Sequence, residues 1–399
     1  MKIAFASDFH FGFGDDALAQ AAEALRQACS EADLVVLAGD LFDSRVPKQE
    51  VVYDAVRLLS EAKAVLEAKA TVSGLKLRLL RDGTETRQTV PIVAIYGTHE
   101  RRTKGLVNII QVLDSAGLVL NCHAGVVAAD LNGERVAIQG MGGVPEEYAK
   151  QVLDAIEFKP LPESFDVFVF HQTLRELIPA VVEGIAAADL PKGFDLYVDG
   201  HIHWARELNE GGKRILLPGS TVVTQMKKSE ASPKGFYVCD SLSKEVVFKE
   251  IRVRPFVYAE VEFKDAWPEE VIAACRLKLE EIALKQAGRK PLVKLKLKGS
   301  LAQRLSTSAV DLTALEKEFG ERMLLTLDRD FEGADLKERI EALRKKRGET
   351  TGARGAGAAL LRERLKERQS PWAEDEQLFA LLAEKESEAA LKHLLAREI

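Results

Sequence analysis

Residues 91–100 read Pro91-Ile92-Val93-Ala94-Ile95-Tyr96-Gly97-Thr98-His99-Glu100, an apolar run that ends in a glycine-bounded turn. Burial would fix the strand, so the histidine on the turn is free to meet a ligand. Four other stretches place Asp or His directly after a strand-like run: Asp8-Phe9-His10, Gly39-Asp40-Leu41-Phe42-Asp43, Phe170-His171 and Gly200-His201-Ile202-His203. Of the 7 histidines, all but His123 and His393 lie in these stretches, which indicates one shared site.

The order of the segments around these stretches predicts a layered α/β fold. Ile3–Ser7 and Leu34–Ala38 are apolar runs typical of buried strands, and the helical periodicity of Asp16–Ser30 lies between them. In such β-α-β units the carboxyl ends of the strands carry the ligand-binding groups. Strands outnumber helices further along the chain, so we expect two sheets face to face with helices outside, a four-layer α-β-β-α sandwich.

The remaining segments divide the chain into four predicted parts. Helices are expected at Lys48–Ala70, Val107–Ala116 and Glu146–Ile156, and strands at Ile92–Tyr96, Asp166–Phe170, Leu196–Asp199, Ile215–Pro218, Gly235–Cys239 and Glu245–Val253. Residues 1–253 form the motif domain. From Phe256 the pattern restarts as strand, helix, strand, helix and strand, which predicts a small α+β domain over 254–343. The Gly/Ala/Thr-rich residues 344–357 are typical of a flexible linker, and 358–399 of a helical tail.

The bulk composition excludes little about function. The 399 residues are 46% hydrophobic and 30% charged, as in an ordinary soluble protein. The net charge of −6 neither indicates nor excludes a nucleic-acid partner. The 4 cysteines lie far apart without a C-x-x-C motif, which suits a reducing compartment. We expect a cytoplasmic protein with no membrane association, because no apolar run approaches the roughly 20 residues of a membrane span and charge appears too early for a signal peptide.

The Asp and His stretches have the chemistry of a metal site. Carboxylate oxygen and imidazole nitrogen suit Mn, Fe and Zn. In D-x-H and H-x-H, strand alternation puts both side chains on one side. Gly39 allows a close approach to Asp40 because it has no Cβ. One carboxylate shared by two ions would hold them about 3.5–4 Å apart, a spacing suited to in-line displacement at phosphorus. The sequence therefore predicts a two-metal phosphodiesterase site.

The motif order D-x-H, G-D-x-x-D, G-x-H-E, H and G-H-x-H resembles the calcineurin-like metallophosphoesterase superfamily. Within it, the start Lys2-Ile3 to Ser7-Asp8-Phe9-His10 and the form Gly39-Asp40-Leu41-Phe42-Asp43 are similar to double-strand-break repair nucleases of the meiotic-recombination-eleven type, called SbcD in bacteria. The resemblance covers residues up to about Val253, and the later segments by layout only. It implies a manganese-dependent DNA exo/endonuclease that acts with a coiled-coil ABC ATPase.

The resemblance also implies roles for individual residues. One metal would be held by Asp8, His10, Asp40 and His203, and the second by Asp40, His171 and His201, with Asp40 as the bridge. His99 matches the catalytic histidine that protonates the leaving oxygen or stabilises the transition state. Asp43 would orient His99 or contact the phosphate, and a carboxylate that caps a helix before Ser44 is the alternative. The expected cofactor is two Mn²⁺, with Mg²⁺, Fe²⁺ or Zn²⁺ as alternatives.

One position departs from the family pattern. The family normally has Asn before the catalytic histidine, and its side-chain carbonyl ligates the second metal, but this chain has Thr98. A hydroxyl is a poorer neutral ligand and reaches less far, so we expect a weaker second site. Because of this departure, a second function remains an alternative: a scaffold that binds DNA ends and has lost nuclease activity. The domain at 254–343 resembles the family's capping domain, which helps to hold and open DNA. A phosphodiesterase for small molecules or cyclic nucleotides is a further alternative, although it would need neither this capping domain nor a tail.

Partner predictions follow from charge and from the resemblance. Arg101, Arg102 and Lys104 come just after the catalytic turn, where they would position a DNA backbone rather than read bases. The helices at 48–70 and 107–116 are candidates for the family's four-helix homodimer interface, and burial on the sheets is the alternative. The tail 358–399 cannot build its own core, so we expect it to dock on the ATPase, with folding back as the alternative. His123 and His393 match no motif and are interpreted as ordinary residues.

Overall fold

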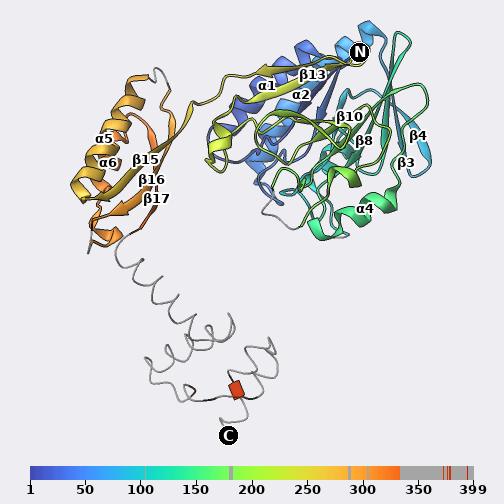
Figure 1. Cartoon of the computed structure of the whole chain (residues 1–399). Helices are drawn as coiled ribbons and strands as arrows, with labels where there is room; N and C mark the ends of the chain where they lie inside the picture. The colour runs from blue at the N-terminus through green and yellow to red at the C-terminus, as the bar shows by residue number, and fades with distance from the viewer. Residues whose placement is uncertain are drawn as a thin grey trace. The chain divides into compact units, whose positions relative to one another are not determined.

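The computed structural model describes residues 1–103, 105–178, 183–285, 289–302 and 305–332, and the isolated positions Trp372, Asp375, Gln377, Leu378 and His393 (Figure 1). These residues form two compact units, the first made of Met1–Tyr258 and Gln286–Lys294 and the second of Ala259–Lys285 and residues from Leu295 onward. Lys104, the predicted linker 344–357 and nearly all of the predicted tail 358–399 lie outside the described residues. None of the helices within the described ranges is long and apolar enough to cross a membrane.

A six-stranded sheet with the order β14-β13-β1-β2-β5-β6 carries the first half of the motif stretches. Its strands are β1 (Lys2–Ala6), β2 (Leu34–Leu37), β5 (Ile92–Ala94), β6 (Leu120–Asn121), β13 (Gly235–Asp240) and β14 (Val246–Glu250). The strands β1, β2, β5 and β6 are parallel, and β13 and β14 pair antiparallel. The crossovers contain α1 (Ala17–Glu31), α2 (Gln49–Ser73) and α3 (Ile109–Ser115), so the carboxyl ends of β1, β2 and β5 meet at one edge.

An eight-stranded sheet with the order β11-β12-β10-β9-β8-β7-β3-β4 carries the other half. Its strands are β3 (Lys76–Arg81), β4 (Thr84–Gln88), β7 (Val126–Leu131), β8 (Glu134–Met141), β9 (Phe165–Phe170), β10 (Leu196–Asp199), β11 (Arg206–Glu210) and β12 (Lys213–Leu217). The central strands β8, β9, β10 and β12 are parallel. Their carboxyl ends therefore also lie together, which places the histidines after β9 and β10 side by side.

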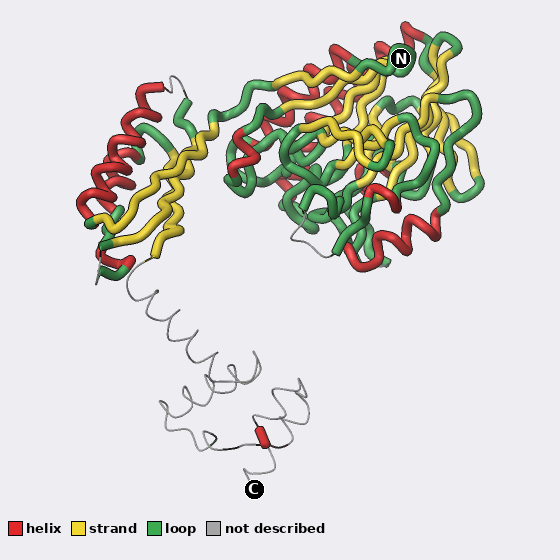
Figure 2. The backbone as a smooth tube through the Cα atoms, viewed as in Figure 1, coloured by secondary structure: helices red, strands yellow, loops and turns green. Residues whose placement is uncertain are grey.

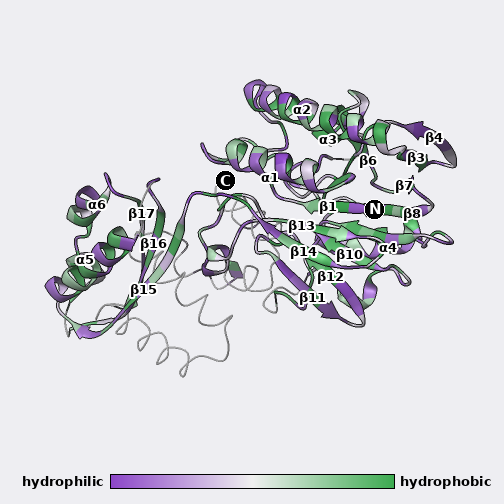
Figure 3. Cartoon of the chain, turned by 90° about the horizontal axis from the view of Figure 1, so that it is seen from above, coloured by the Kyte–Doolittle hydropathy of each residue, from purple (hydrophilic) through white to green (hydrophobic). Residues whose placement is uncertain are grey.

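The strand alternation explains how the sheets stack. Val167 and Val169 in β9 belong to the large core cluster that contains Ile3 and Phe5 of the first sheet, whereas Phe168 packs into a second cluster with helix α4 (Ala149–Ile156). Because alternate residues of β9 pack into two different core clusters, one face of β9 packs against the other sheet, and the opposite face packs against α4 and neighbouring loops. Figure 3 shows α1, α2 and α3 together on one side of the sandwich, and the cluster that joins α4 to Phe168 covers the outer face of the other sheet. The predicted α/β sandwich is confirmed.

The second unit has the predicted order of elements. These are β15 (Phe256–Ala266), α5 (Pro268–Lys285), β16 (Leu292–Leu301), α6 (Thr313–Phe319) and β17 (Leu324–Glu332), with the sheet order β15-β16-β17. Figure 2 shows both helices on one face of this sheet. Val271, Cys275 and Leu279 are buried at helical spacing in α5, and Val293 and Leu295 alternate with lysines in β16. The domain boundary at residue 254 and the end at 343 stay predictions.

Two elements differ from the sequence expectations. The predicted helix Glu146–Ile156 begins with a 3-10 turn at Glu146–Tyr148, and only α4 continues as an α-helix. The strand β11 was not predicted, because its sequence Arg-Glu-Leu-Asn-Glu has no apolar alternation. It lies at the edge of the sheet and pairs antiparallel with β12, so its side chains are mostly exposed. An edge strand can be held by backbone pairing without the pattern that burial imposes.

Glycines allow the strand-end turns of the two sheets to touch. A Cβ on Gly200, after β10, would overlap the Ala38 carbonyl oxygen, after β2. A Cβ on Gly143 would lie 2.7 Å from the carbonyl carbon of Gly97. A real Cβ cannot approach backbone atoms this closely, so the two edges would have to move apart. The motif glycines therefore set the distance between the two halves of the site.

We predict that Gly200→Ala destabilises the protein by about 2 kcal/mol, the usual size of an overpacking penalty. Chemical denaturation followed by circular dichroism measures the loss. Gly83→Ala is the comparison, since Gly83 has a φ of 71° but open space around it. That variant isolates the cost of a left-handed backbone, about 1 kcal/mol. A loss for Gly200→Ala no larger than that for Gly83→Ala would contradict the steric explanation.

His123 connects the two sheets beside the turn of residues 97–100, which follows β5. Its Nδ1 accepts the backbone N–H of Gly142 at 3.0 Å, and its Nε2 lies 3.2 Å from the Tyr96 hydroxyl. Tyr96 directly precedes the Gly97 turn, and its carbonyl accepts the N–H of Gly143 at 2.8 Å. Burial and the charge of Arg81 lower the pKa of His123 from 6.5 to about 4. The imidazole is therefore held neutral and acts as a structural hydrogen-bonding group.

This pKa shift predicts a pH dependence of stability. Between pH 6.5 and about 4 the unfolded chain takes up a proton at His123 that the folded chain refuses, so the free energy of unfolding falls as the pH falls. The His123→Gln variant should lose that part of the decline, on the order of 2 kcal/mol. Urea unfolding at pH 7 and pH 4.5, both in EDTA, measures it. Parallel pH profiles for the two proteins would refute the assignment.

Candidate metal centre

The strand ends bring together the side chains that the sequence singles out. Asp8 and His10 follow β1, Asp40 and Asp43 follow β2, Thr98 and His99 follow β5, His171 follows β9, and His201 and His203 follow β10. Each comes from the carboxyl end of a parallel strand. The two sheets face each other, so ligands separated by almost 200 residues meet at one edge. This is the arrangement that the β-α-β order predicts.

Three of these residues have an unusual backbone conformation. Asp8, His10 and Asp40 have φ values of 52°, 46° and 47°, in the left-handed region that side chains rarely adopt. The N–H of Asp8 donates to the Gly39 carbonyl at 3.0 Å, and that of His10 donates to the Asp40 carbonyl at 3.1 Å. Backbone hydrogen bonds between the two turns thus hold conformations that would otherwise be unfavourable. Such local strain is typical of functional sites.

Asp40 lies at the centre of the cluster. Its Oδ1 accepts the N–H of His99 at 2.8 Å, and its Oδ2 accepts the Thr98 hydroxyl at 3.2 Å. Its Oδ2 also lies 3.1 Å from Nε2 of His171. Burial opposes ionisation of this carboxyl, but His171 and the neighbouring histidines hold its pKa below the usual range. Asp40 is therefore an anion that contacts elements of both sheets.

His171 is oriented by a backbone carbonyl. Its Nδ1 donates to the carbonyl oxygen of Ala38 at 2.8 Å, so Nε2 points toward Asp40. Burial would lower the pKa of this histidine, but the charge of Asp40 raises it to about 10. The imidazole ring of His171 thus carries a proton on both nitrogens, and the proton on Nε2 lies between this nitrogen and the carboxylate of Asp40. A cation bound between them would take the place of that proton, which is the usual arrangement of a metal-ligating histidine.

The donor set fits metal ions. Both oxygens of Asp8 and both ring nitrogens of His10 are buried without a hydrogen-bond partner among the described residues. Burial raises the pKa of Asp8. Its Oδ1 lies 3.8 Å from His10 Nε2 and 3.6 Å from His203 Nε2. A buried carboxylate without donors is unfavourable unless a cation compensates it. Groups suited to a metal are Asp8 with His10 and His203, Asp8 with Asp40 and His171, and His10 with Asp43 and His99.

His201 stands slightly apart from these groups. It belongs to none of the three, but its ring centroid lies 5.2 Å from that of His171. Its Nδ1 is buried and lacks a hydrogen-bond partner in the described part of the chain. Burial lowers its pKa to about 3, so the ring is neutral and keeps a lone pair for a cation. Its geometry therefore fits a ligand of an ion near His171.

Asp43 lies between two histidines. Its Oδ1 lies 3.3 Å from Nδ1 of His10 and 3.6 Å from Nδ1 of His99, and its carbonyl oxygen lies 3.0 Å from the same His99 nitrogen. The alternative that Asp43 caps a helix is wrong, because α2 begins only at Gln49 with Lys48 as its N-cap. With Nδ1 of His99 directed at the Asp43 carbonyl, Nε2 is left to face a substrate.

A network behind His203 was not foreseen from the sequence. The Thr224 hydroxyl lies 2.7 Å from His203 Nδ1 and 3.3 Å from the carboxylate of Glu230, which is 2% exposed. Despite burial, the hydrogen bonds to Glu230 lower its pKa to about 2. Lys234 donates to the His203 carbonyl at 2.8 Å, and burial lowers its pKa to about 8. A carboxylate behind a ligand histidine commonly fixes its orientation.

Glu100 has a similar supporting role in the catalytic turn. One of its carboxylate oxygens accepts the N–H of Phe42 at 2.9 Å and the other accepts the N–H of Gly97 at 2.8 Å. The residue is fully buried, and burial together with Asp40 raises its pKa to about 8. It ties the turn that carries His99 to the turn that carries Asp40. The position of Glu100 directly after the histidine was its only signal in the sequence.

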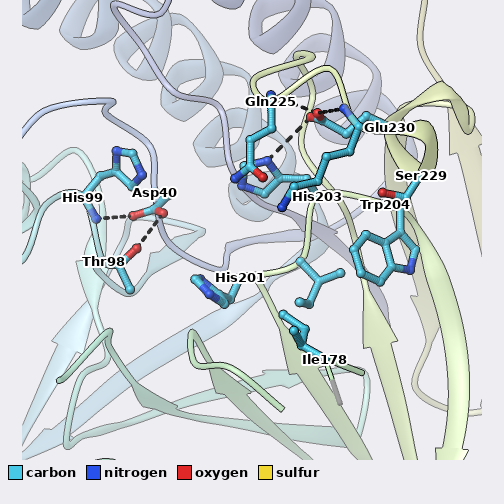
Figure 4. A pocket seen from close by; sticks show the side chains of 12 residues that line it. Asp40, Thr98, His99, Ile178, His201, His203, Trp204, Gln225, Ser229 and Glu230 are labelled. Atoms are coloured by element: carbon cyan, nitrogen blue, oxygen red, sulfur yellow. Dashed lines mark hydrogen bonds and ion pairs between the residues drawn. The ribbon is translucent and has the colours of Figure 1, made fainter. Parts of the chain in front are cut away.

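A pocket opens at the cluster (Figure 4). It holds about 160 Å³ and is lined on one side by Asp40, Thr98, His99, His201 and His203. The predicted DNA-binding residues Arg101 and Arg102 are half-buried and do not line it. Arg102 donates to the Arg45 carbonyl at 3.4 Å. Lys104 lies outside the described residues.

Comparisons with known proteins agree with this geometry. The chain is similar to the DNA double-strand break repair protein Mre11 of Methanopyrus kandleri, with 33% identity over 55% of this chain and 48% of that protein. A relative of the same name in Archaeoglobus fulgidus is 25% identical over 81% of this chain and 72% of its own length. The double-strand break repair protein MRE11 of Coprinopsis cinerea is 26% identical over 68% of this chain and 44% of its own length. The chain spans about half the length of the first curated relatives it matches.

A family model gives the broader classification. The model for calcineurin-like phosphoesterases matches residues 1–205, which include every predicted metal ligand and end just after His203. The match covers more than half of the 399 residues. The resemblance to this superfamily is thereby confirmed. With its strand-end Asp and His residues gathered at the edge of two facing sheets, the chain belongs to the calcineurin-like phosphoesterase family.

Proposed function

We propose that this protein is a manganese-dependent DNA exo/endonuclease that hydrolyses phosphodiester bonds at a two-metal site during double-strand break repair. The observation that carries the proposal is the buried carboxylate of Asp8, to which none of the described residues donates a hydrogen bond and which is surrounded by histidines and Asp40. Family membership supports hydrolysis of a phosphate ester. The relatives named as double-strand break repair proteins support DNA as the substrate.

The proposed ligands divide between two ions. The first set is Asp8, His10, Asp40 and His203, and the second is Asp40, His171, His201 and, weakly, Thr98. Divalent ions there would withdraw charge from the phosphoryl oxygens and generate a nucleophile from water. Manganese is the proposed metal, and Mg²⁺, Fe²⁺ and Zn²⁺ remain compatible with these donors. The central position of Asp40 supports its role as the bridging carboxylate.

His99 is the proposed proton donor to the leaving oxygen. Its side chain is 44% exposed in the pocket, whereas the proposed ligand histidines are more deeply buried. The Asp43 carbonyl accepts the Nδ1 proton, and the N–H of His99 donates to Asp40. These contacts orient the ring without occupying Nε2. Arg101 and Arg102, which follow on the same turn, are proposed to hold the DNA backbone, and Lys104 is proposed with them from the sequence.

The His99→Ala variant should lower kcat by about 10²- to 10⁴-fold, the usual contribution of a positioned acid. Manganese binding should remain, because His99 is not a proposed ligand. Cleavage of linear duplex DNA and of bis-p-nitrophenyl phosphate, with manganese and with EDTA, measures the effect. His123→Gln, which also removes a histidine but lies outside the pocket, is the control.

The same assay separates the rival functions. Manganese-dependent cleavage of DNA supports the nuclease. Cleavage of the small ester alone would favour a small-molecule or cyclic-nucleotide phosphodiesterase. If the wild-type protein cleaves neither substrate but still binds DNA ends, the nuclease proposal is wrong and the scaffold with a weakened metal site replaces it.

The position of Thr98 gives a second prediction about the metals. Its hydroxyl lies 3.2 Å from Asp40 Oδ2, beside the proposed bridge, but offers a short neutral ligand. Thr98→Asn would extend an amide carbonyl into this space and should tighten binding of the second manganese ion about tenfold, an effect comparable to other changes beside metal ligands. Isothermal titration of the metal-free protein measures it. Thr98→Val, which removes the oxygen, should weaken binding, and superimposable titrations would reject the idea.

The second unit is proposed to be a DNA-capping domain. Lys296 and Lys298 alternate with the buried residues Leu295 and Leu297 of β16 and so lie together on the sheet face opposite the buried side. Ion pairs link Lys296 to Asp330 and Lys298 to Glu260, so part of their charge is balanced within the unit. These lysines support contact with a DNA phosphate backbone. The domain boundaries, residues 254–343, are part of the proposal.

Assembly and location complete the proposal. The tail 358–399, beyond the flexible linker predicted at 344–357, is proposed to bind the coiled-coil ABC ATPase, on sequence grounds alone. A homodimer through α2 and α3 is proposed because Tyr53, Val65 and Val112 are exposed. Val72 of α2 is exposed as well, whereas other apolar positions of these helices, such as Leu59, are buried within the first unit, which fits the alternative of burial on the sheets. All 4 cysteines are free and buried, which supports a reducing, cytoplasmic location.

A further inference from the structure

The pocket at the metal centre extends beyond the residues that catalysis requires. On the side away from His99 it is lined by Trp204, Ile178 and Ile202. Figure 4 shows the indole of Trp204 at one end of the pocket and His99 with Asp40 at the other, with His201 between them. Ile202 is 2% exposed, while Trp204 and Ile178 are half-buried. The metal centre therefore opens onto an apolar wall with one aromatic ring.

The backbone that carries the indole is held in place by close contacts. Trp204 packs against the outer core cluster of the eight-stranded sheet. A Cβ on Gly219 would lie 3.0 Å from the carbonyl carbon of Trp204, so the two backbones are in direct contact. The preceding carbonyl, of His203, accepts hydrogen bonds from Lys234 at 2.8 Å and from the N–H of Ser220 at 3.3 Å. A ring that packs on a core and extends from a restrained backbone has less freedom to lose when a flat group stacks on it.

Polar side chains complete the wall. Gln225, Lys227 and Ser229 line the same pocket and are exposed. The loop that carries them is folded around Glu230, which accepts the N–H groups of Gln225 at 2.9 Å and Lys227 at 3.2 Å. An amide can bond the edge of a base, and an ammonium can bond a phosphate. This combination of stacking ring, amide and cation matches a nucleotide better than a wholly apolar or wholly charged ligand.

We infer that Trp204, Ile178 and Ile202 form a base subsite that receives one unstacked nucleobase of the strand whose phosphate lies at the metals. This inference rests on the proposed nuclease function and deepens it. A base inside a duplex is stacked on both faces, so it cannot also lie on the indole. The substrate nucleotide therefore enters from a single strand or a frayed end. Lys227 bonds the neighbouring phosphate.

Two esters with the same leaving group test the subsite. Thymidine 5′-(4-nitrophenyl) phosphate and methyl 4-nitrophenyl phosphate differ only in the nucleoside. Trp204→Ala should lower kcat/KM for the thymidine ester roughly 10- to 100-fold, as expected for loss of one base–aromatic stack. It should change kcat/KM for the methyl ester less than twofold, and Trp204→Phe should keep most of the activity on both. Equal losses on both esters, or no loss on either, would overturn the inference.

A binding measurement keeps this test separate from the proposed function. Thymidine 5′-monophosphate and 2-deoxyribose 5-phosphate are titrated calorimetrically into wild-type protein and Trp204→Ala, whose fold is checked by circular dichroism. The subsite requires that the nucleotide binds the wild type at least tenfold more tightly than the sugar phosphate, and that Trp204→Ala abolishes the difference. Equal or undetectable binding of the two ligands overturns it. If neither these esters nor linear duplex DNA is cleaved with manganese, the nuclease proposal fails while the titration still decides on the subsite.

Discussion

The burial of two carboxylates within one cluster is the constraint on which the rest of this structure depends. Asp8 and Asp40 are each at most 2% exposed, and both belong to the same potential metal group with His171. Two anions at this depth repel each other and lose their hydration, so the fold needs positive charge between them. Histidines from the facing sheet supply part of it. Divalent cations would supply the rest, which explains why the donors converge.

The Asp and His side chains can converge only if the turns that carry them adopt backbone conformations that few sequences allow. Asp8, His10 and Asp40 have left-handed conformations, and glycines at 39 and 200 leave no room for a side chain. Hydrogen bonds between neighbouring turns stabilise these conformations, and the two packed sheets keep the turns in place. The large common core thus offsets strain that is concentrated at one edge. This division between a stable scaffold and a strained rim is common in enzymes.

The orientation of three of the site histidines depends on a residue outside the motifs or on a backbone atom. Nδ1 of His171 donates to the Ala38 carbonyl, and His99 uses the carbonyl of Asp43. His203 contacts Thr224, which is itself held by Glu230. In each case one ring nitrogen is bound to the protein and the other faces the site. The chemistry of the pocket is therefore determined as much by these supporting contacts as by the motif residues.

The sequence by itself determined the α/β class, the strand-end position of the Asp and His stretches and the departure at Thr98. These features can be read from the sequence because burial imposes a periodic pattern of apolar residues on helices and strands, and because parallel strands present their carboxyl ends at one edge of a sheet. It could not reveal the polar edge strand β11, the carboxylate of Glu230 or the wall around Trp204. The strand β11 has no recognisable pattern because its side chains are mostly exposed and only backbone pairing with β12 holds it. The contacts of Glu230 with His203 and the wall around Trp204 arise where separate segments of the chain meet, and only the tertiary structure decided them, because no local pattern records such contacts.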